Sequence, residues 1–233
     1  MDEIGNHLKI KMKLAFLEQM YAIYDHYLED KEFSCKRFCD SCCTRNVTIT
    51  TLEGSYILRH LSSQDQGNLI GCLERDRFKA RFSPEVTINR FADCCRNGGN
   101  PPEEEADPNW TPCSLLKGNE CPIYRYRPFG CRCLVSTVHC RETGFAQIDP
   151  LLLTINTIFQ QYIEHIDLHG ATGNLIDVIL HLKQEDGNEV FQRDKKLKNT
   201  NLVSNTILTY LMIPPEHREE VWPILDSIQR IRV

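Results

Sequence analysis

Hydrophobic residues recur at three- and four-residue steps along much of the chain, the spacing of helices that bury one face. The first such stretch covers residues 7–31. Its apolar positions are Leu8, Met12, Phe16, Met20, Ile23, Tyr24, Tyr27 and Leu28. This pattern predicts an amphipathic helix that leads into a group of cysteines.

Three further helices are expected before residue 100, two of them from helix-capping residues. Thr50 and Glu53 have the spacing of a capping box, so we expect a helix over residues 51–61. A charged helix is expected over residues 63–81. Ser83-Pro84-Glu85 has the form of a cap with proline at the first helical position, and the segment that it opens ends at residues 97–99.

The C-terminal part is also helical in pattern. Asp149-Pro150 is a cap with a following proline, and the apolar periodicity after it continues until Gly170. Two more helices are predicted over residues 172–183 and 215–230. Pro223 falls inside the second, where it must kink or interrupt the helix.

Only residues 47–50 and 133–138 have the character of strands. The predicted fold class is therefore mainly α, with helices connected by irregular cysteine-bearing loops and at most a short β element. We expect a single domain over residues 1–233. In it, residues 33–145 form a cysteine-cluster metal-binding core and residues 146–233 a helical part packed on that core.

Composition narrows the function classes. The chain has 233 residues, with 27 Lys and Arg against 32 Asp and Glu, so no basic surface for nucleic acid is expected. The N-terminus mixes Lys into its apolar stretches, unlike a signal peptide, and the most apolar window, residues 151–159, is too short to cross a bilayer. We therefore expect a cytoplasmic protein with no membrane partner.

Twelve cysteines are the compositional excess that needs an explanation. In a reducing compartment thiols do not pair, so metal binding is favoured over structural disulfides. The cysteines fall largely into two blocks. The first consists of Cys35, Cys39, Cys42 and Cys43, and the second of Cys113, Cys121, Cys131, Cys133 and Cys140, with His139 beside the last.

The spacing of the cysteines does not identify the metal. The step from Cys39 to Cys42 can turn two sulfurs onto one ion. The long separation of the blocks does not fit a zinc ribbon, and the first block does not match ferredoxin spacing. Tertiary folding must therefore assemble the site. Thiolates without a clear His or carboxylate partner suit either zinc or iron–sulfur.

Two segments carry a family resemblance: CKRFCDSCC, and PCSLLKGNECPIYRYRPFGCR far downstream. Together they resemble the CxxCxxCC cysteine-cluster family, the YkgJ-like zinc- or iron-chelating proteins. The resemblance covers residues 33–134. The downstream matches are Pro112, Cys113, Leu116, Cys121, Ile123, Tyr124, Arg127, Pro128, Cys131 and Arg132. The first step departs from the pattern, because three residues separate Cys35 from Cys39.

The resemblance implies a metal site made from Cys39, Cys42, Cys43, Cys113, Cys121 and Cys131, with Cys35 included. A relative with the same module, the flagellin lysine methylase, depends on S-adenosylmethionine and a [4Fe-4S] cluster. By that analogy we expect a [4Fe-4S] centre in an enzyme of methyl-transfer or redox type, acting on a protein or small molecule, with S-adenosylmethionine use resting on analogy alone. The alternative is a non-catalytic accessory protein with structural zinc or mononuclear iron.

Two arginines and a short proline-containing turn surround the last predicted ligand. Arg127 and Arg132 flank Cys131 and could stabilise a negatively charged thiolate site, or could pair with surface acids. Ile123 and Tyr124 are expected to pack under the loop, and Pro128 to shape the ligand turn.

Other reactive residues receive plainer interpretations. Cys72 is expected to be a small core residue, and Cys94 and Cys95 structural or redox-spectator thiols at a helix end. Cys133, His139 and Cys140 could add a second site. His165 and His169 could share one face of a helix, and the charged run over residues 193–198 is expected to be solvated.

Overall fold

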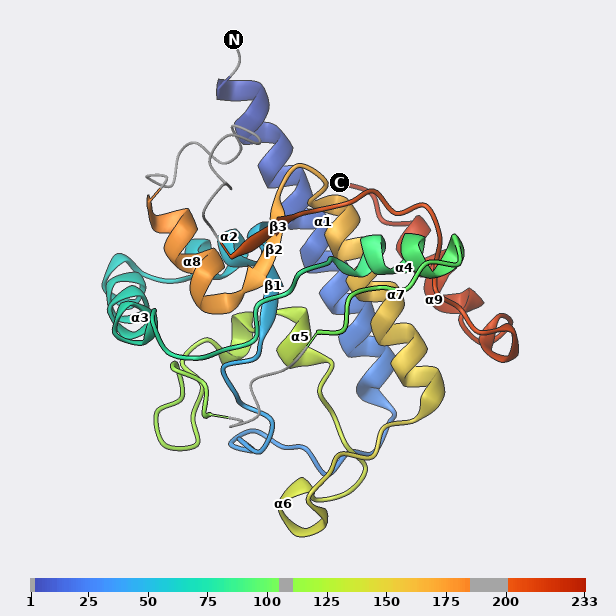
Figure 1. The fold of residues 1–233 in the computed structure, drawn as a ribbon, viewed down its shortest axis with the longest axis horizontal. Helices are drawn as coiled ribbons and strands as arrows, with labels where there is room; N and C mark the ends of the chain where they lie inside the picture. The colour runs from blue at the N-terminus through green and yellow to red at the C-terminus, as the bar shows by residue number, and fades with distance from the viewer. Residues whose placement is uncertain (1–2, 105–110, 185–200) are drawn as a thin grey trace.

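The computed structural model describes residues 3–104, 111–184 and 201–233, so the charged run over residues 193–198 lies outside it. This part of the chain is mainly helical, as predicted (Figure 1). Its helices are α1 (Glu3–Glu29), α2 (Thr51–His60), α3 (Ser63–Asp76), α4 (Ile88–Arg96), α5 (Phe129–Arg132), α6 (Cys140–Thr143), α7 (Pro150–Ile166), α8 (Leu175–Gln184) and α9 (Trp222–Gln229), with 3-10 turns η1 (Tyr124–Tyr126) and η2 (Pro215–His217).

A small antiparallel sheet joins distant parts of the chain. It consists of β1 (Thr48–Thr50), β2 (Ala171–Asn174) and β3 (Leu202–Ser204) in the order β1-β2-β3. Ile49 lies opposite Gly173. A side chain at Gly173 would begin 2.3 Å from the Leu202 side chain, so glycine is what allows β3 to approach β2.

Two hydrophobic clusters form the interior. The first lies between α1, α7 and α9, where the Tyr24 hydroxyl, fully buried, donates to Asn156 Oδ1 at 2.7 Å. Asp149 caps α7 by accepting from the amides of Leu151 and Leu152, which confirms the predicted start of this helix. The second cluster lies between the sheet, α2, α3 and α8.

Local signals predicted α2 well and the next two helices less well. Thr50 and Glu53 form the expected capping box. The helix expected over residues 63–81 ends at Asp76, and the Arg81 side chain instead binds Asp177 at 2.5 Å. The predicted cap at residues 83–85 is wrong, because Glu104 accepts the Glu85 amide and α4 starts later, behind Thr87.

The structure also differs in detail from three expectations for the second half of the chain. Residues 172–174 belong to β2, so α8 begins only at Leu175. Residues 133–138 form no strand, because Ser136 Oγ accepts from the Val138 and Gln147 amides and curls this segment. The helix expected over residues 215–230 is interrupted before Pro223, as its sequence predicted: η2 covers Pro215–His217, and α9 begins at Trp222 with Pro223 in its first turn, where a missing N–H costs nothing.

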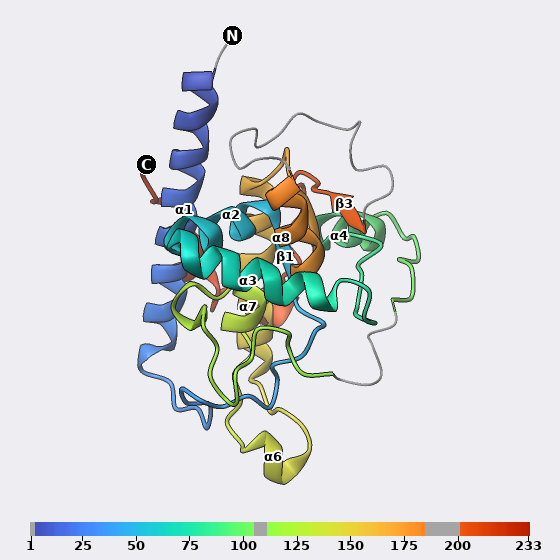
Figure 2. The ribbon, with the colours of Figure 1, turned by 90° about the vertical axis from the view of Figure 1, so that its left-hand side faces the viewer.

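The cysteine-bearing loops lie together at one end of the molecule. In both views the segment after α1 and the segment that carries α6 lie beyond the ends of α1 and α7 (Figures 1 and 2). None of the helices that the structure describes has the length and apolar character needed to cross a membrane. The packed helices therefore support one loop region, which contains the predicted site.

Candidate metal-binding site

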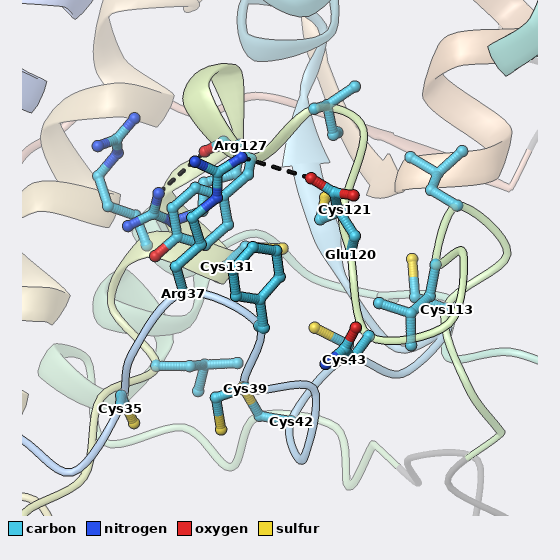
Figure 3. A pocket seen from close by; sticks show the side chains of 18 of the residues that line it. Cys35, Arg37, Cys39, Cys42, Cys43, Cys113, Glu120, Cys121, Arg127 and Cys131 are labelled. Carbon is cyan, nitrogen blue, oxygen red and sulfur yellow. Dashed lines mark hydrogen bonds and ion pairs between the residues drawn. The ribbon is translucent and has the colours of Figure 1, made fainter.

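A pocket of about 170 Å³ opens in this loop region (Figure 3). Its lining contains every cysteine that the sequence assigns to the site: Cys35, Cys39, Cys42, Cys43, Cys113, Cys121 and Cys131. None of the twelve cysteines forms a disulfide. The fold thus brings together two blocks of thiols that are far apart in the chain.

Backbone pairing joins the two blocks directly. Thr44 and Pro112 form an antiparallel bridge. On either side of it the Cys113 amide donates to the Cys43 carbonyl and the Arg45 amide to the Thr111 carbonyl, both at 2.9 Å. Because these bonds fix the register of the two segments, Cys43 and Cys113 lie at adjacent positions of the pocket wall.

Cys131 is placed by the short helix α5. The Pro128 carbonyl accepts from the Cys131 and Arg132 amides, both at 3.0 Å, so this proline starts the ligand turn as expected. Gly130 faces β1, and a side chain there would begin 3.2 Å from the Thr48 carbonyl oxygen. The absence of a side chain at Gly130 therefore allows α5, with Cys131, to pack against the sheet.

Glu53 holds α5 from the other side. Its carboxylate is buried and accepts from the Phe129 amide at 2.7 Å and from the Tyr21 hydroxyl at 2.9 Å. The same side chain accepts from the Thr50 amide in the capping box. Glu53 therefore ties the start of α2 to the helix that carries Cys131. The sequence signalled its capping role, but not this second one.

The three downstream thiols share an environment that favours the neutral form. Burial raises the pKa of Cys131, and the nearby thiols of Cys113, Cys121 and Cys42 raise it further. Burial also raises the pKa of Cys113 and of Cys121. A metal that binds here would have to displace these protons, so its affinity would increase with pH.

Backbone amides and cations act in the opposite direction. Hydrogen bonds from the backbone of Leu115 and Leu116 lower the pKa of Cys113 in part, and one from Ile123 acts in the same way on Cys121. Amides directed at sulfur stabilise thiolate, as they do around ligating cysteines. The downstream turns therefore already contain the polar support that a thiolate ligand needs.

The sequence does not predict the network of polar contacts behind Cys113. The Arg45 guanidinium lowers the pKa of Cys113 in part and contacts Asp76 at 3.3 Å. The Ser114 hydroxyl donates to the same Asp76 at 2.8 Å, and the Cys72 thiol donates to the Ser114 carbonyl at 2.8 Å. These contacts fasten the Cys113 loop to α3. No motif marks them, because they join segments that are distant in sequence.

The upstream loop is less firmly held. Cys39 and Cys42 are exposed, and the backbone turns back on itself through bonds from the Cys39 amide to Lys36 and from the Cys43 amide to Asp40. A hydrogen bond with the Cys43 thiol raises the pKa of Cys42. Phe38 has a φ of 74°, a left-handed conformation that is costly for a bulky residue.

The two predicted arginines take different places. Arg127 lies at the pocket wall with its guanidinium 4.1 Å from the centre of the Tyr124 ring, and it lowers the pKa of Cys121 in part (Figure 3). Arg132 also lines the pocket but is 7% exposed, and it binds Asp25 at 2.8 Å and stacks on Tyr21. Arg132 therefore pairs with an acid as well as bordering the site.

The two residues expected to pack under the loop differ. Ile123 is buried, as predicted, whereas Tyr124 is 37% exposed at the pocket wall. Across the pocket wall, Arg37 from the upstream block and Glu120 from the downstream block form an ion pair at 3.4 Å (Figure 3). Aromatic and charged side chains from both blocks thus border the thiols.

The remaining cysteines and histidines are placed apart from this lining. Cys133 is buried in the first hydrophobic cluster, and Cys94 and Cys95 lie on α4. Cys72 is partly buried and packs against the second hydrophobic cluster, at the edge of the core in which we expected it. His165 and His169 do not share a helix face, because α7 ends at Ile166 and His165 accepts from the Leu208 amide.

The donors fit a thiophilic metal by chemistry and location. Soft sulfur donors from both blocks line one pocket, with amides and guanidinium groups around them. Across residues 3–104, 111–184 and 201–233, however, no three side chains of His, Cys, Asp or Glu converge closely enough to hold an ion as they stand. Metal binding would therefore require the thiols to move closer together.

Comparison of the chain with protein-family models, with curated proteins and with solved structures gives no match. The resemblance to the CxxCxxCC family therefore rests on the residues of the two cysteine blocks. The case for a metal site rests on how those residues lie in this pocket.

Proposed function

We propose that the chain is a cysteine-cluster metalloprotein that binds an iron–sulfur centre, of the [4Fe-4S] type, through thiolates of both blocks. The observation that carries this proposal is the single pocket lined by Cys35, Cys39, Cys42, Cys43, Cys113, Cys121 and Cys131. Hydrophobic packing gives no reason to gather so many thiols around an open pocket, whereas thiolate ligation of a metal does.

The number of donors favours a cluster over one zinc ion. A structural zinc uses four ligands, and the pocket wall offers more thiols than that. A [4Fe-4S] cluster also uses four thiolates, but it is larger and reaches donors that are spread around a pocket. When bound, it would supply one-electron redox chemistry.

The chain's own residues supply charge compensation and access. Arg45 lies near Cys113, and Arg127 near Cys121, so two cations offset the negative charge of deprotonated thiols. Tyr124 and Arg127 also line the pocket, whose volume of about 170 Å³ leaves room for a small molecule or a protein side chain beside the thiols. The methyl-transfer or redox activity on such a substrate is taken from family analogy. The reducing compartment is the one that the sequence analysis leads us to expect.

Anaerobic purification tests the proposal. Protein produced with added iron should be brown, with broad visible absorption and equal amounts of iron and acid-labile sulfide. Oxidation in air should bleach this absorption. Colourless protein that contains zinc but neither iron nor sulfide would overturn the iron–sulfur assignment.

The second candidate is a non-catalytic accessory protein whose zinc or mononuclear iron is structural. One observation favours it: Cys113 and Cys121 pack against the second hydrophobic cluster, so a metal bound by them would brace the core. This candidate predicts that a chelator unfolds the helices, as measured by far-ultraviolet circular dichroism. A metal-free protein with unchanged helical signal would exclude it.

A further inference from the structure

Cys140 lies outside both cysteine blocks, on the short helix α6, yet its segment is fastened to the upstream loop at two points. At one end the Ser34 amide donates to the Ser136 carbonyl at 2.8 Å, and the Ser34 hydroxyl to the Thr137 carbonyl at 2.9 Å. At the other end Arg141 forms an ion pair with Asp40.

These two ties enclose three cysteines. Cys35 and Cys39 lie between Ser34 and Asp40 on one segment, and Cys140 lies between Thr137 and Arg141 on the other. The ties hold the two segments beside each other, so Cys140 lies near Cys35, while its own thiol contacts the Val138 carbonyl at 3.9 Å. Cys140 is partly buried, as expected for a side chain between two segments rather than on an open surface.

The electrostatic surroundings agree with this placement. Burial raises the pKa of Cys35, and the thiols of Cys39, Cys42 and Cys140 raise it further, so Cys35 has three other thiols around it. Asp40, which binds Arg141, raises the pKa of that guanidinium, and Cys39 contributes in the same direction. The Arg141 guanidinium therefore lies near the Cys39 thiol.

We propose that Cys140 completes an outer set of four thiols, with Cys35, Cys39 and Cys42, that binds a thiophilic divalent metal such as zinc or iron. An inner set of Cys43, Cys113, Cys121 and Cys131 remains for the centre proposed above. The inference rests on that proposed function, which it deepens by dividing the thiols into two sets.

The two sets meet at Cys42 and Cys43, whose thiols hydrogen-bond to each other. One sulfur of this adjacent pair is assigned to each set. Cys43 is held beside Cys113 by the bridge between the blocks. Cys42 lies with Cys35 and Cys39 along one edge of the pocket (Figure 3). Each set then has the four thiolates that a tetrahedral thiolate site uses.

Cobalt titration of anaerobic metal-free protein tests the inference. Co²⁺ in a tetrahedral thiolate site absorbs in the visible region, so the bound equivalents can be counted. The unchanged protein should bind about two equivalents per chain, and Cys140→Ser or Cys131→Ser about one each. Cys95→Ser, an exposed cysteine on α4, is the matched control and should bind as the unchanged protein does.

The outcomes separate this inference from the proposed function. If Cys131→Ser loses cobalt and Cys140→Ser binds as the unchanged protein does, Cys140 is no ligand and the proposed thiolate site survives. If the unchanged protein binds no cobalt, the proposed site itself is wrong.

Alkylation of the unchanged protein gives a second test that needs no variant to fold. Zn²⁺ should slow iodoacetamide labelling of Cys140, followed by mass spectrometry of its peptide, by about tenfold or more, because a ligating sulfur is no longer a free thiolate. Labelling of Cys95 should not change. Equal labelling of Cys140 with and without Zn²⁺ would overturn the assignment.

Discussion

The two sides of the pocket are built differently. On the downstream side, Cys113 and Cys131 are partly buried, and their turns are fastened by Asp76 and Glu53, which are side chains of the core helices. On the upstream side, Cys39 and Cys42 are exposed, and their loop is held by its own short turns and by contacts of Ser34 and Asp40 with another loop segment. Side chains of the core helices therefore anchor one half of the site, whereas loop contacts alone hold the other half.

This difference explains how thiols can gather without forming a ready ion site. A rigid set of buried thiols close enough to ligate would repel one another once deprotonated. With one half anchored by core helices and the other held by loop contacts, the thiols can stay protonated and apart until a metal brings them together. We therefore expect substitutions on the anchored side to affect both folding and metal, and substitutions in the upstream loop to affect metal alone.

The largest expected effect is on metal content. Cys131→Ala should weaken binding by more than the about 10–100-fold that loss of an outer hydrogen-bond partner costs. Cys39→Ala should also lower bound metal sharply, whereas Cys95→Ala should not, because Cys95 lies on α4 and does not line the pocket. Metal per chain, measured by elemental analysis, decides this. Equal content in all three variants would show that the site is misassigned.

The pH dependence of stability tests the anchor of α2. Asp167 is fully buried and accepts from the Thr51 hydroxyl and the Leu52 amide at the start of that helix. Burial raises its pKa from 3.8 to about 7. The folded state therefore takes up a proton that the unfolded state releases, and this contribution to stability is complete below pH 4 and lost as the pH rises through 7.

Asp167→Asn should remove this dependence. The free energy of unfolding of the unchanged protein, from urea titrations, should fall between pH 4 and 7, by roughly 4 kcal/mol at most from this group. The free energy of unfolding of the variant should change less with pH over the same range, by that amount. Parallel pH profiles of the two proteins would show that Asp167 does not titrate in this window.

Glu53→Gln should lower the free energy of unfolding by about 2–3 kcal/mol, because a buried acceptor with several partners is replaced by a side chain that can accept fewer bonds. The Phe129 amide and Tyr21 hydroxyl would lose their charged acceptor. Glu29→Gln, on the exposed end of α1, is the control and should change the free energy of unfolding by less than about 0.5 kcal/mol. Similar urea midpoints for both variants would contradict the anchoring role.

The smallest effect is expected at Phe38. Because its φ is 74°, Phe38→Gly should be more stable than Phe38→Ala by about 1 kcal/mol, the reverse of the usual order. The comparison of the two variants isolates the backbone, since both lose the ring. If alanine is the more stable, the left-handed conformation is not what the upstream loop requires.

Local chemistry in the sequence predicted the parts that depend on local contacts. The capping box of α2 and the Asp149 cap of α7 are satisfied within one turn of each helix, so their residues identify the start. The cap expected at Ser83 failed because Glu104 accepts the neighbouring amides. The strand β2 was missed since its partners come from other parts of the chain.

The sequence by itself determined the helical class and the two thiol blocks, because helix periodicity and cysteine spacing are local patterns, and the family resemblance implied the seven cysteines that line the pocket. Only the tertiary structure decided that Thr44 pairs with Pro112, that Glu53 and Asp76 anchor the turns of Cys131 and Cys113, and that Arg141, next to Cys140, pairs with Asp40 of the upstream loop. These contacts join residues far apart in the chain, where hydrogen bonding and burial, rather than any motif, select the partner.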